Sequence, residues 1–416
     1  MKSVTEIDTR VIPDEPPMTQ RPVKVCMHVL ADGRADARVL RAMRSGSALA
    51  QSGFATSIVY IEMEGTVPVE EEVDGVSMQR LLVPGWYISR RFEPWFFVVA
   101  VKTFILSMAH MLRLRADIYH ACELTALPAC YIVSRLLRKP LIFEAFDLQI
   151  PVPGTEIAFW RRVGTYLYST LLPRCAGIVV TSPLHGQELR HHYPVSGITL
   201  VRNVPKYRAV QKTDRLRQYL GLSPATRIAL YQGNIHYDRG LDRLIREASR
   251  LEPDIVIVMM GKGIGSSQAE LEALIAREGV AGRVKIVPPV PYDELLEWTA
   301  SADVGLIVHR PDFSLNIQTL LPNKLFEYLM AGVPVLTSEL GAVVDIVERY
   351  DVGQVVRSVE PGAIAAALNA LLADDAALQR MRQNALESAK NELNWEKDSL
   401  QLVRLYEDIV GKMKER

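Results

Sequence analysis

Short apolar runs alternate with helical segments along almost the whole chain, and this alternation restricts the possible folds more than any other feature. In the first unit, residues 23–29 (VKVCMHV) and 55–61 (ATSIVYI) read as buried strands, and the helical segment between them ends at Gly53. Strands joined by a helix pair in parallel, because a parallel connection needs a long crossover. The sequence therefore predicts an α/β fold.

The alternation occurs in two series, separated by the polar, aperiodic segment 205–214 (PKYRAVQKTD). A chain of 416 residues is about twice the length of an ordinary domain. We therefore predict a flexible leader at 1–21, Rossmann-like domains at 22–205 and 206–391, and a final amphipathic helix at 392–416. Two such domains place a cleft at the carboxyl ends of their strands. Further strands are predicted at 116–120, 140–144, 177–181, 198–201, 227–232, 254–260, 284–287, 304–308 and 333–337, and further helices at 127–137, 159–172, 185–192, 241–248, 268–278, 292–300, 361–374, 375–391 and 394–413.

Charge and cysteine content exclude several classes of function. Lys+Arg and Asp+Glu are balanced at 48 each, so no bulk field favours nucleic acid as a partner. The four cysteines (Cys26, Cys122, Cys130 and Cys175) form no C-x-x-C pair and lie in apolar stretches. This pattern favours buried thiols in a reducing cytoplasm over disulfides or a zinc site. The first residues contain no apolar signal segment, and no metal cluster is visible.

One apolar segment, residues 94–112 (PWFFVVAVKTFILSMAHML), approaches the length of a membrane span. Lys102 and His110 lie inside it, and α/β pattern continues on both sides, so a span is the least favoured interpretation. A buried helix of the first domain is favoured. The alternative is a helix lying on a membrane surface with Arg90, Arg91, Arg113 and Arg115 on lipid phosphates.

The stretch 321–339 (LPNKLFEYLMAGVPVLTSE) holds polar residues in the first turns of an apolar helix. Pro322 suits the first helical position, which leaves the amides of Leu321, Asn323 and Lys324 as helix-end donors that attract phosphate. Lys324 adds a positive charge, and Glu327 lies on the same face, where a carboxylate accepts hydrogen bonds from two vicinal hydroxyls of a ribose. The alternative is an ordinary helix start with a Lys324–Glu327 ion pair.

This stretch resembles the signature helix of GT-B retaining glycosyltransferases of family four. The resemblance extends in motif order over nearly all of residues 23–413. It includes D-x-R-V-L at 36–40, ADIYHACEL at 116–124, VRN at 201–203, YQGN with RGLDRLI at 231–245, MGKG at 260–263 and PPVPYDELLEWTASADVGLIV at 288–308.

The resemblance implies two Rossmann-like domains facing across a cleft, with the last helix crossing back to the first domain. It implies transfer of a sugar, with retention, from a nucleotide diphospho-sugar to a hydroxyl acceptor such as a polysaccharide, lipid-linked glycan or glycolipid. The enzyme would be cytoplasmic, either free or peripheral at the inner face of the membrane. Segment 94–112 weakly favours a lipid-borne acceptor. Neither cofactor nor metal is expected, because basic groups and a helix end replace the charge of a metal.

Donor-binding residues are carried over by position. Glu327 matches the second glutamate of the E-x(7)-E element, which holds the ribose, and Arg239 matches the basic residue that neutralises the diphosphate. Asn316 either binds sugar hydroxyls or satisfies the backbone of an ordered loop at 309–322. The implied donor-binding set is Gly233, Asn234, Arg239, Val287, Val290, His309, Asn316, Thr319, Leu320, Leu321, Asn323, Lys324 and Glu327.

The acceptor side is implied to contain Gly33, Arg38, His120, Glu123 and Asp147. His120, at a strand end, is the candidate catalytic histidine, together with Arg239 and Lys324 on the donor side. Two alternatives stay open: His120 is a satisfied buried histidine, and Arg38 is a surface charge.

Three departures from the family pattern bear on activity. Thr319 stands where the first glutamate belongs, Asn234 where an arginine is usual, and Phe146-Asp147 where the family has His followed by an acid. Lys324 or His309 would compensate for the missing arginine. Two rival functions stay open. Another GT-B enzyme, such as an inverting transferase or an epimerase, would use an acceptor-side carboxylate from Asp147 or Glu123, and the missing glutamate and arginine motivate a non-catalytic binding subunit.

Overall fold

The computed structural model describes residues 21–33, 36–62, 69–83, 94–146, 158–236, 239–310 and 314–415. Its first half is built on an eight-stranded sheet of order β3-β4-β2-β1-β5-β6-β7-β8. Every pairing is parallel except that of β3 with β4. The strands are β1 (Lys24–Asp32), β2 (Ala55–Glu62), β3 (Glu70–Val73), β4 (Val76–Leu82), β5 (Ile118–Cys122), β6 (Leu141–Ala145), β7 (Gly177–Val180) and β8 (Ile198–Leu200).

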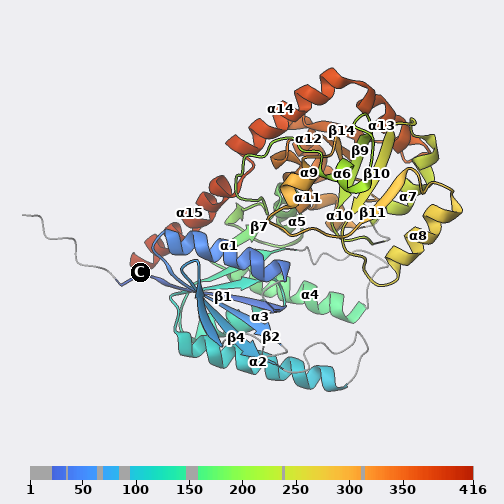
Figure 1. The fold of residues 1–416 in the computed structure, drawn as a ribbon. Helices are drawn as coiled ribbons and strands as arrows, with labels where there is room; N and C mark the ends of the chain where they lie inside the picture. Colours follow the sequence, from blue (N-terminus) through green and yellow to red (C-terminus); the bar gives the residue numbers. More distant parts are fainter. Residues whose placement is uncertain are drawn as a thin grey trace, which may run out of the picture.

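All six strands predicted for this half are present, but the β3–β4 hairpin was missed. Strand β3 reads EEEV and lies at the sheet edge, where Glu70 and Glu72 are exposed, so it lacks an apolar run. Helices α1 (Ala37–Gln51) and α15 (Trp395–Lys414) cover one face of the sheet. The other face is covered by α2 (Pro94–Leu114), α3 (Leu127–Leu136) and α4 (Ala158–Leu171), and α5 (Pro183–His192) follows β7 (Figure 1).

The second half contains six parallel strands in the order β11-β10-β9-β12-β13-β14, which places the topological switch between β9 and β12. These strands are β9 (Arg227–Gln232), β10 (Ile255–Met260), β11 (Val284–Val287), β12 (Val304–Ile307), β13 (Val335–Ser338) and β14 (Gly353–Val356). The helices are α6 (Arg215–Leu220), α7 (Leu241–Glu247), α8 (Ser267–Arg277), α9 (Leu295–Thr299), α10 (Leu315–Thr319), α11 (Asn323–Met330), α12 (Gly341–Tyr350), α13 (Ala363–Ala373) and α14 (Asp375–Asn391).

Three expectations for this half were wrong. Residues 309–322 were predicted as a loop, but five of them form α10, whose shortness hides its period. Pro322 caps α11 with an extended backbone instead of occupying its first turn. Helix α12 and strand β14 were not predicted, although α12 buries Ala342, Val343, Ile346 and Val347 at helical spacing.

The last helix crosses back to the first sheet, as the resemblance implied (Figure 1). Leu405 packs onto β7, where a Cβ placed on Gly177 would lie 2.8 Å from its side chain. Tyr406 is fully buried, and the Arg44 guanidinium of α1 lies 5.6 Å from the ring centroid of Trp395. These contacts fasten the end of the chain across the first domain.

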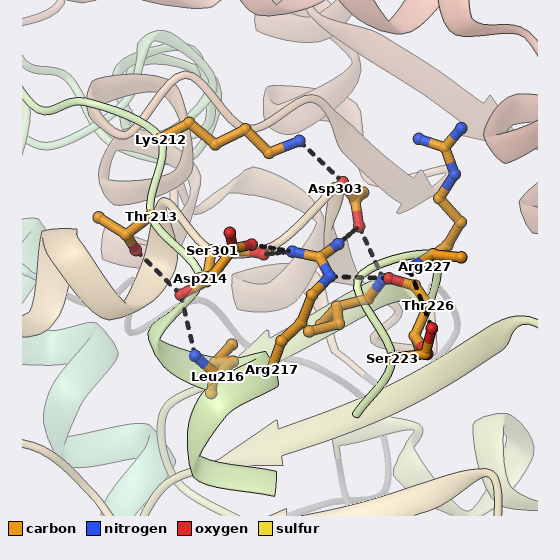
Figure 2. Close-up of polar contacts among 12 residues, drawn as sticks. Lys212, Thr213, Asp214, Leu216, Arg217, Ser223, Thr226, Arg227, Ser301 and Asp303 are labelled. Carbon is orange, nitrogen blue, oxygen red and sulfur yellow. Dashed lines mark hydrogen bonds and ion pairs between the residues drawn. The ribbon is translucent and has the colours of Figure 1, made fainter. Parts of the chain in front are cut away.

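The polar segment predicted as the domain boundary has neither helix nor strand over residues 201–214, and its end is tied to the second sheet (Figure 2). Lys212 Nζ lies 3.1 Å from Asp303 Oδ1, and the Arg217 guanidinium binds the same carboxylate. Asp303 also accepts a hydrogen bond from the Ile228 amide at 2.8 Å. Lys212 and Arg217 thus hold the end of the segment beside the start of β9, through Asp303.

None of the described helices is both long and apolar enough to cross a lipid bilayer. Helix α2 contains the segment 94–112 and packs Val99 and Met111 into the core under the first sheet. It is therefore a helix of the first domain, but it is not a buried one as the favoured interpretation expected, because Val98, Val101 and Ile105 are exposed.

Candidate active site

A cavity of about 680 Å³ lies at the carboxyl end of the second sheet, and Ala37 from the start of α1 contributes to its wall. Ligands of open parallel sheets bind at this edge, beside the topological switch. Its lining combines glycine-rich backbone, three cations and one carboxylate. The lining residues are Ala37, Tyr231, Gln232, Gly233, Asn234, Arg239, Met260, Gly261, Lys262, Pro289, Val290, Leu295, His309, Ile317, Leu320, Pro322, Asn323, Lys324, Glu327 and Leu340.

The amino terminus of α11 opens into this cavity. Pro322, Asn323 and Lys324 line it, and no side chain caps the first turn. Tyr328 fixes the helix to the sheet: its hydroxyl donates to the Leu230 carbonyl at 2.9 Å and accepts from the Gln232 amide at 3.1 Å. A fixed helix amino terminus carries a partial positive charge and oriented amides, so it is suited to an anion.

Lys324 lies over the loop that follows β9. Its Nζ is 3.7 Å from the centroid of the Tyr231 ring and beside Gly233. Gly233 has φ +118°, a conformation that other residues rarely adopt. A Cβ on Gly261 would lie 1.7 Å from the Gly233 carbonyl oxygen, so glycine is required there too. The backbone is thereby brought close to the cavity, with an ammonium group above it.

Arg239 provides the second cation and is held by His309. Arg239 Nη1 lies 3.1 Å from His309 Nε2. Burial, with Lys324 and Arg239 close by, lowers the pKa of His309 to about 2. The imidazole is therefore neutral, and its Nε2 accepts a hydrogen bond from the guanidinium. His309 positions Arg239 in the cavity wall.

Glu327 lies half-buried one turn into α11. Gln232 Nε2 donates to its Oε2 at 2.6 Å, and Thr299 Oγ1 donates to Gln232 Oε1 at 2.8 Å. Burial raises the pKa of Glu327, against the opposing effects of the Gln232 hydrogen bond and of Lys324 and Arg44. This chain of hydrogen bonds fixes the carboxylate as an acceptor at the cavity wall.

Most of the predicted donor-binding residues line this cavity, but Val287, Asn316, Thr319 and Leu321 are not among its lining. Thr319 is only 3% exposed, and its hydroxyl donates to the Leu315 carbonyl at 2.9 Å. Its own carbonyl accepts a hydrogen bond from Ser182 Oγ of the first domain. Thr319 thus contributes to the contact between the domains.

On the first domain, Gly33, Arg38 and Glu123 come together at the ends of β1 and β5. Arg38 binds Asp36 through Nε and Nη2, both at 2.8 Å, and its Nη1 lies 3.3 Å from Glu123 Oε2. Glu123 has φ +83°, an uncommon conformation for a residue other than glycine and one that recurs at functional sites. The structure thus groups three of the predicted acceptor-side residues beside Ala37. Asp147 lies outside the described residues.

His120 does not lie at this edge. It is fully buried, and along β5 it shares the face of Ile118 and Cys122, which is covered by α1 and α15. His120 Nδ1 is 2.7 Å from the Tyr406 hydroxyl oxygen, and burial lowers the pKa of His120 to about 4. The expectation that it lies at the strand end facing the cleft is therefore corrected: His120 is buried in the core, and its part in the reaction stays a prediction.

The Glu144 carboxylate completes this buried cluster. Its Oε2 lies 3.5 Å from His120 Nε2, and its Oε1 accepts from Arg41 Nε at 2.8 Å and Nη2 at 2.6 Å. Potential ligand atoms of His120, Cys122 and Glu144 all lie within 4.8 Å of one another. The Arg41 cation already occupies the carboxylate and would repel a metal ion, so the group does not fit a metal site.

Sequence reasoning missed several residues of the site. Tyr231 and Gln232 belong to the YQGN motif but were not named as site residues, although their place before Gly233 puts them at the carboxyl end of β9. Lys262 lines the cavity from the G-x-G turn. Asn203 Nδ2 donates to Asn323 Oδ1 at 2.7 Å, which ties the tip of α11 to the first domain. Neither the hydrogen bond nor its partner is visible in sequence.

Comparison with known proteins agrees with the fold. Residues 212–388 match the family described as Glycosyl transferases group 1. The D-inositol 3-phosphate glycosyltransferase of Xylanimonas cellulosilytica is 30% identical over 228 residues, covering 54% of this chain and 52% of that protein. The enzyme of the same name from Corynebacterium glutamicum is 28% identical over 330 residues, covering 74% and 76%. The chain thus spans about half the length of several of these curated relatives.

Solved structures match over almost the full chain. Sucrose-phosphate synthase from Thermosynechococcus elongatus superposes with a TM-score of 0.80 at 18% identity, covering 94% of this chain and all of that one. Anabaena Alr3699/HepE in complex with UDP-glucose gives 0.67 at 14% identity, with 94% and 100% covered. Identities this low establish the fold alone. These structures show the GT-B fold, and the match to Glycosyl transferases group 1 covers residues 212–388.

Proposed function

We propose that the protein transfers a sugar from a nucleotide diphospho-sugar to a hydroxyl acceptor with retention of configuration. The observation that carries this proposal is the convergence of Arg239, Lys324 and the amino terminus of α11 on one cavity, with Glu327 one turn deeper. The cations and amides suit a diphosphate, and the carboxylate suits the two hydroxyls of a ribose.

The chemistry follows from where charge develops. Breaking the bond from the anomeric carbon to the diphosphate leaves negative charge on the leaving phosphate and oxocarbenium character on the sugar. Arg239, Lys324 and the α11 amides stabilise that phosphate without having to donate a proton. The leaving phosphate oxygen then takes the proton of the acceptor hydroxyl, so the reaction needs neither His120 nor a metal ion. Closure of the domains excludes water and protects the donor from hydrolysis.

For the donor we propose a UDP-sugar as the first candidate, because the similar fold of Anabaena Alr3699/HepE is described in complex with UDP-glucose. Glu327, oriented by Gln232, would hold the ribose. Pro289 and Val290, which follow β11, would contact the base. Thr319 carries no carboxylate and lies in the domain contact, so we do not propose it as a ligand of the donor sugar.

The acceptor would approach from the edge formed by Gly33, Arg38 and Glu123, where Ala37 already reaches the cavity wall. We propose a hydroxyl-bearing glycan or a lipid-linked glycan as its class, in polysaccharide, lipid-linked glycan or glycolipid synthesis. All four cysteines are free thiols, which supports a reaction on the cytoplasmic side.

The test is a thermal-shift screen with UDP, GDP and ADP, followed by turnover of the matching nucleotide sugar. A nucleotide that binds the folded state raises the melting temperature by mass action. Release of nucleoside diphosphate on addition of acceptor supports transfer, and NMR of the product anomeric proton distinguishes retention from inversion. Nucleotide binding without release from any donor would indicate the non-catalytic alternative, which the position of Thr319 favours. A chain that binds none of these nucleotides contradicts the proposal.

A further inference from the structure

Helix α2 exposes apolar residues and buries polar ones. Val98, Val101 and Ile105 are 53%, 57% and 58% exposed, whereas Thr103 and Ser107 are buried against the sheet. A helix on the surface of a protein in water has the opposite distribution, with its apolar stripe toward the core. The outward side of α2 is therefore suited to a medium less polar than water.

The neighbouring helices extend this surface. Helix α3 packs beside α2, and α4 packs beside α3. Ile132 and Leu136 of α3 are exposed, as is Tyr166 of α4. Val98, Val101 and Ile105 share one side of α2 through their helical spacing, and grouped rather than scattered exposed apolar side chains mark an interaction site. We call the exposed apolar side chains of these three helices the apolar face. The apolar face consists of Val98, Val101, Ile105, Ile132, Leu136 and Tyr166.

Charge on the three helices has only one sign. The sequences of α2, α3 and α4 contain no Asp or Glu, although the whole chain has 48 acidic residues for 48 basic ones. Lys102, Arg113, Arg135 and Arg162 are exposed around the apolar face. An apolar surface rimmed by cations alone complements an anionic one.

A second cavity, of about 940 Å³, lies where α3 ends beside the last turns of α15. Its described lining includes Arg135, Arg138, Lys139, Arg174 and Lys412 and no carboxylate. Asp117 pairs with Lys139 from outside this lining, at 2.9 Å. The remaining cations suit the phosphate of a lipid headgroup.

We propose that the apolar face docks on the surface of an anionic phospholipid bilayer. Val98, Val101 and Ile105 enter the boundary between headgroups and acyl chains, and the surrounding cations bind lipid phosphates, which is how interfacial helices hold to membranes. Because a helix that joins parallel strands runs antiparallel to them, these three residues lie toward the strand carboxyl ends, where the 680 Å³ cavity opens. Docking would present that cavity to a lipid-borne acceptor, but binding itself does not depend on the proposed transfer.

The full chain is tested by sedimentation with extruded vesicles of pure phosphatidylcholine and of phosphatidylcholine with phosphatidylglycerol, without nucleotide. We expect binding to the anionic vesicles that falls with salt, and weak binding to the zwitterionic ones. The double variant V101E/I105E should abolish it. The double variant R135Q/R138Q should weaken the partition coefficient at least about tenfold, because each cation near such a surface contributes on the order of 1 kcal/mol.

Matched controls are V359E, which changes an exposed valine of the second domain (69% exposed), and R277Q/K390Q, which neutralises two exposed cations there. Both should bind anionic vesicles like the unaltered chain. Absence of binding to anionic vesicles, or binding that V101E/I105E leaves unchanged, overturns the proposal. A dimer in lipid-free solution that V101E/I105E dissociates assigns the face to a second copy and overturns it too. UDP-induced stabilisation, measured on the same samples, reports separately on the proposed function.

Discussion

Two clusters of charged residues, one in each domain, contain residues that were expected at the reaction centre, and the clusters differ in what covers them. Arg239, Lys324 and Glu327 lie in the wall of an open cavity at strand carboxyl ends. The cluster of His120, Glu144 and Arg41 is closed under α1 and α15, with side chains at most 4% exposed. The same types of residue therefore suit a ligand site in one place and a structural core in the other, and coverage decides between the two.

The largest effect is expected from breaking the closed cluster. Arg41→Met removes the partner of a fully buried carboxylate and the donor to the Val201 carbonyl at 2.8 Å. Loss of one partner of a buried pair costs about 3–5 kcal/mol of unfolding free energy. We expect a strongly lowered midpoint in urea unfolding. Nucleotide affinity at a temperature where the variant is folded should be unchanged, and a loss of affinity there would mean that the cluster belongs to the site.

Substitutions in the open cluster should weaken nucleotide binding and leave the stability of the protein nearly unchanged. Arg239→Ala removes charge-assisted hydrogen bonds to a diphosphate, each contributing about 1.5–3 kcal/mol, and should weaken nucleotide binding by about one to two orders of magnitude. Glu327→Ala should likewise abolish most of the thermal shift. Stability without nucleotide should change little. The matched control is Arg246→Ala, an exposed arginine of the same domain. Thermal shifts by nucleotide that are unchanged in both variants would contradict the site.

The contrast between the clusters also shows how much of the fold and of the site the sequence could predict. Alternating apolar runs predicted the positions of eleven strands through local pattern alone. The helix-end chemistry of Asn323 and Lys324 was visible because it depends on neighbours in sequence. The burial of His120 was not visible, since it depends on Tyr406, which is 286 residues away. The place of Thr319 in the contact between the domains likewise depends on a hydrogen bond from Ser182, which is distant in sequence. Pattern places a residue at a strand end but does not reveal what packs over it.

Acid should destabilise both regions through neutral buried histidines. Burial lowers the pKa of His120 to about 4 and that of His309 to about 2, the latter with help from Lys324 and Arg239. Below pH about 6.5 the unfolded chain binds protons that the folded chain does not, so the free energy of unfolding falls as pH decreases. At pH 5 each histidine accounts for on the order of 2 kcal/mol. Urea unfolding from pH 7 to 5 measures this loss, and His309→Gln should reduce it; an identical pH dependence in that variant would contradict the placement of His309.

The smallest effect is expected from Tyr406→Phe, which tests whether the last helix does more than cover His120. The substitution keeps the ring, with its edge-on contact to Phe54 at 5.6 Å between centroids, and removes only the hydroxyl 2.7 Å from His120 Nδ1. Losing a buried hydrogen bond of this kind costs about 1–2 kcal/mol. We expect a small decrease in unfolding free energy, with kcat and KM for the donor sugar unchanged, because His120 faces the core. A lowered kcat at unchanged stability would instead connect His120 to the reaction and return it to the acceptor side, so this conservative change separates a histidine that packs from one that reacts.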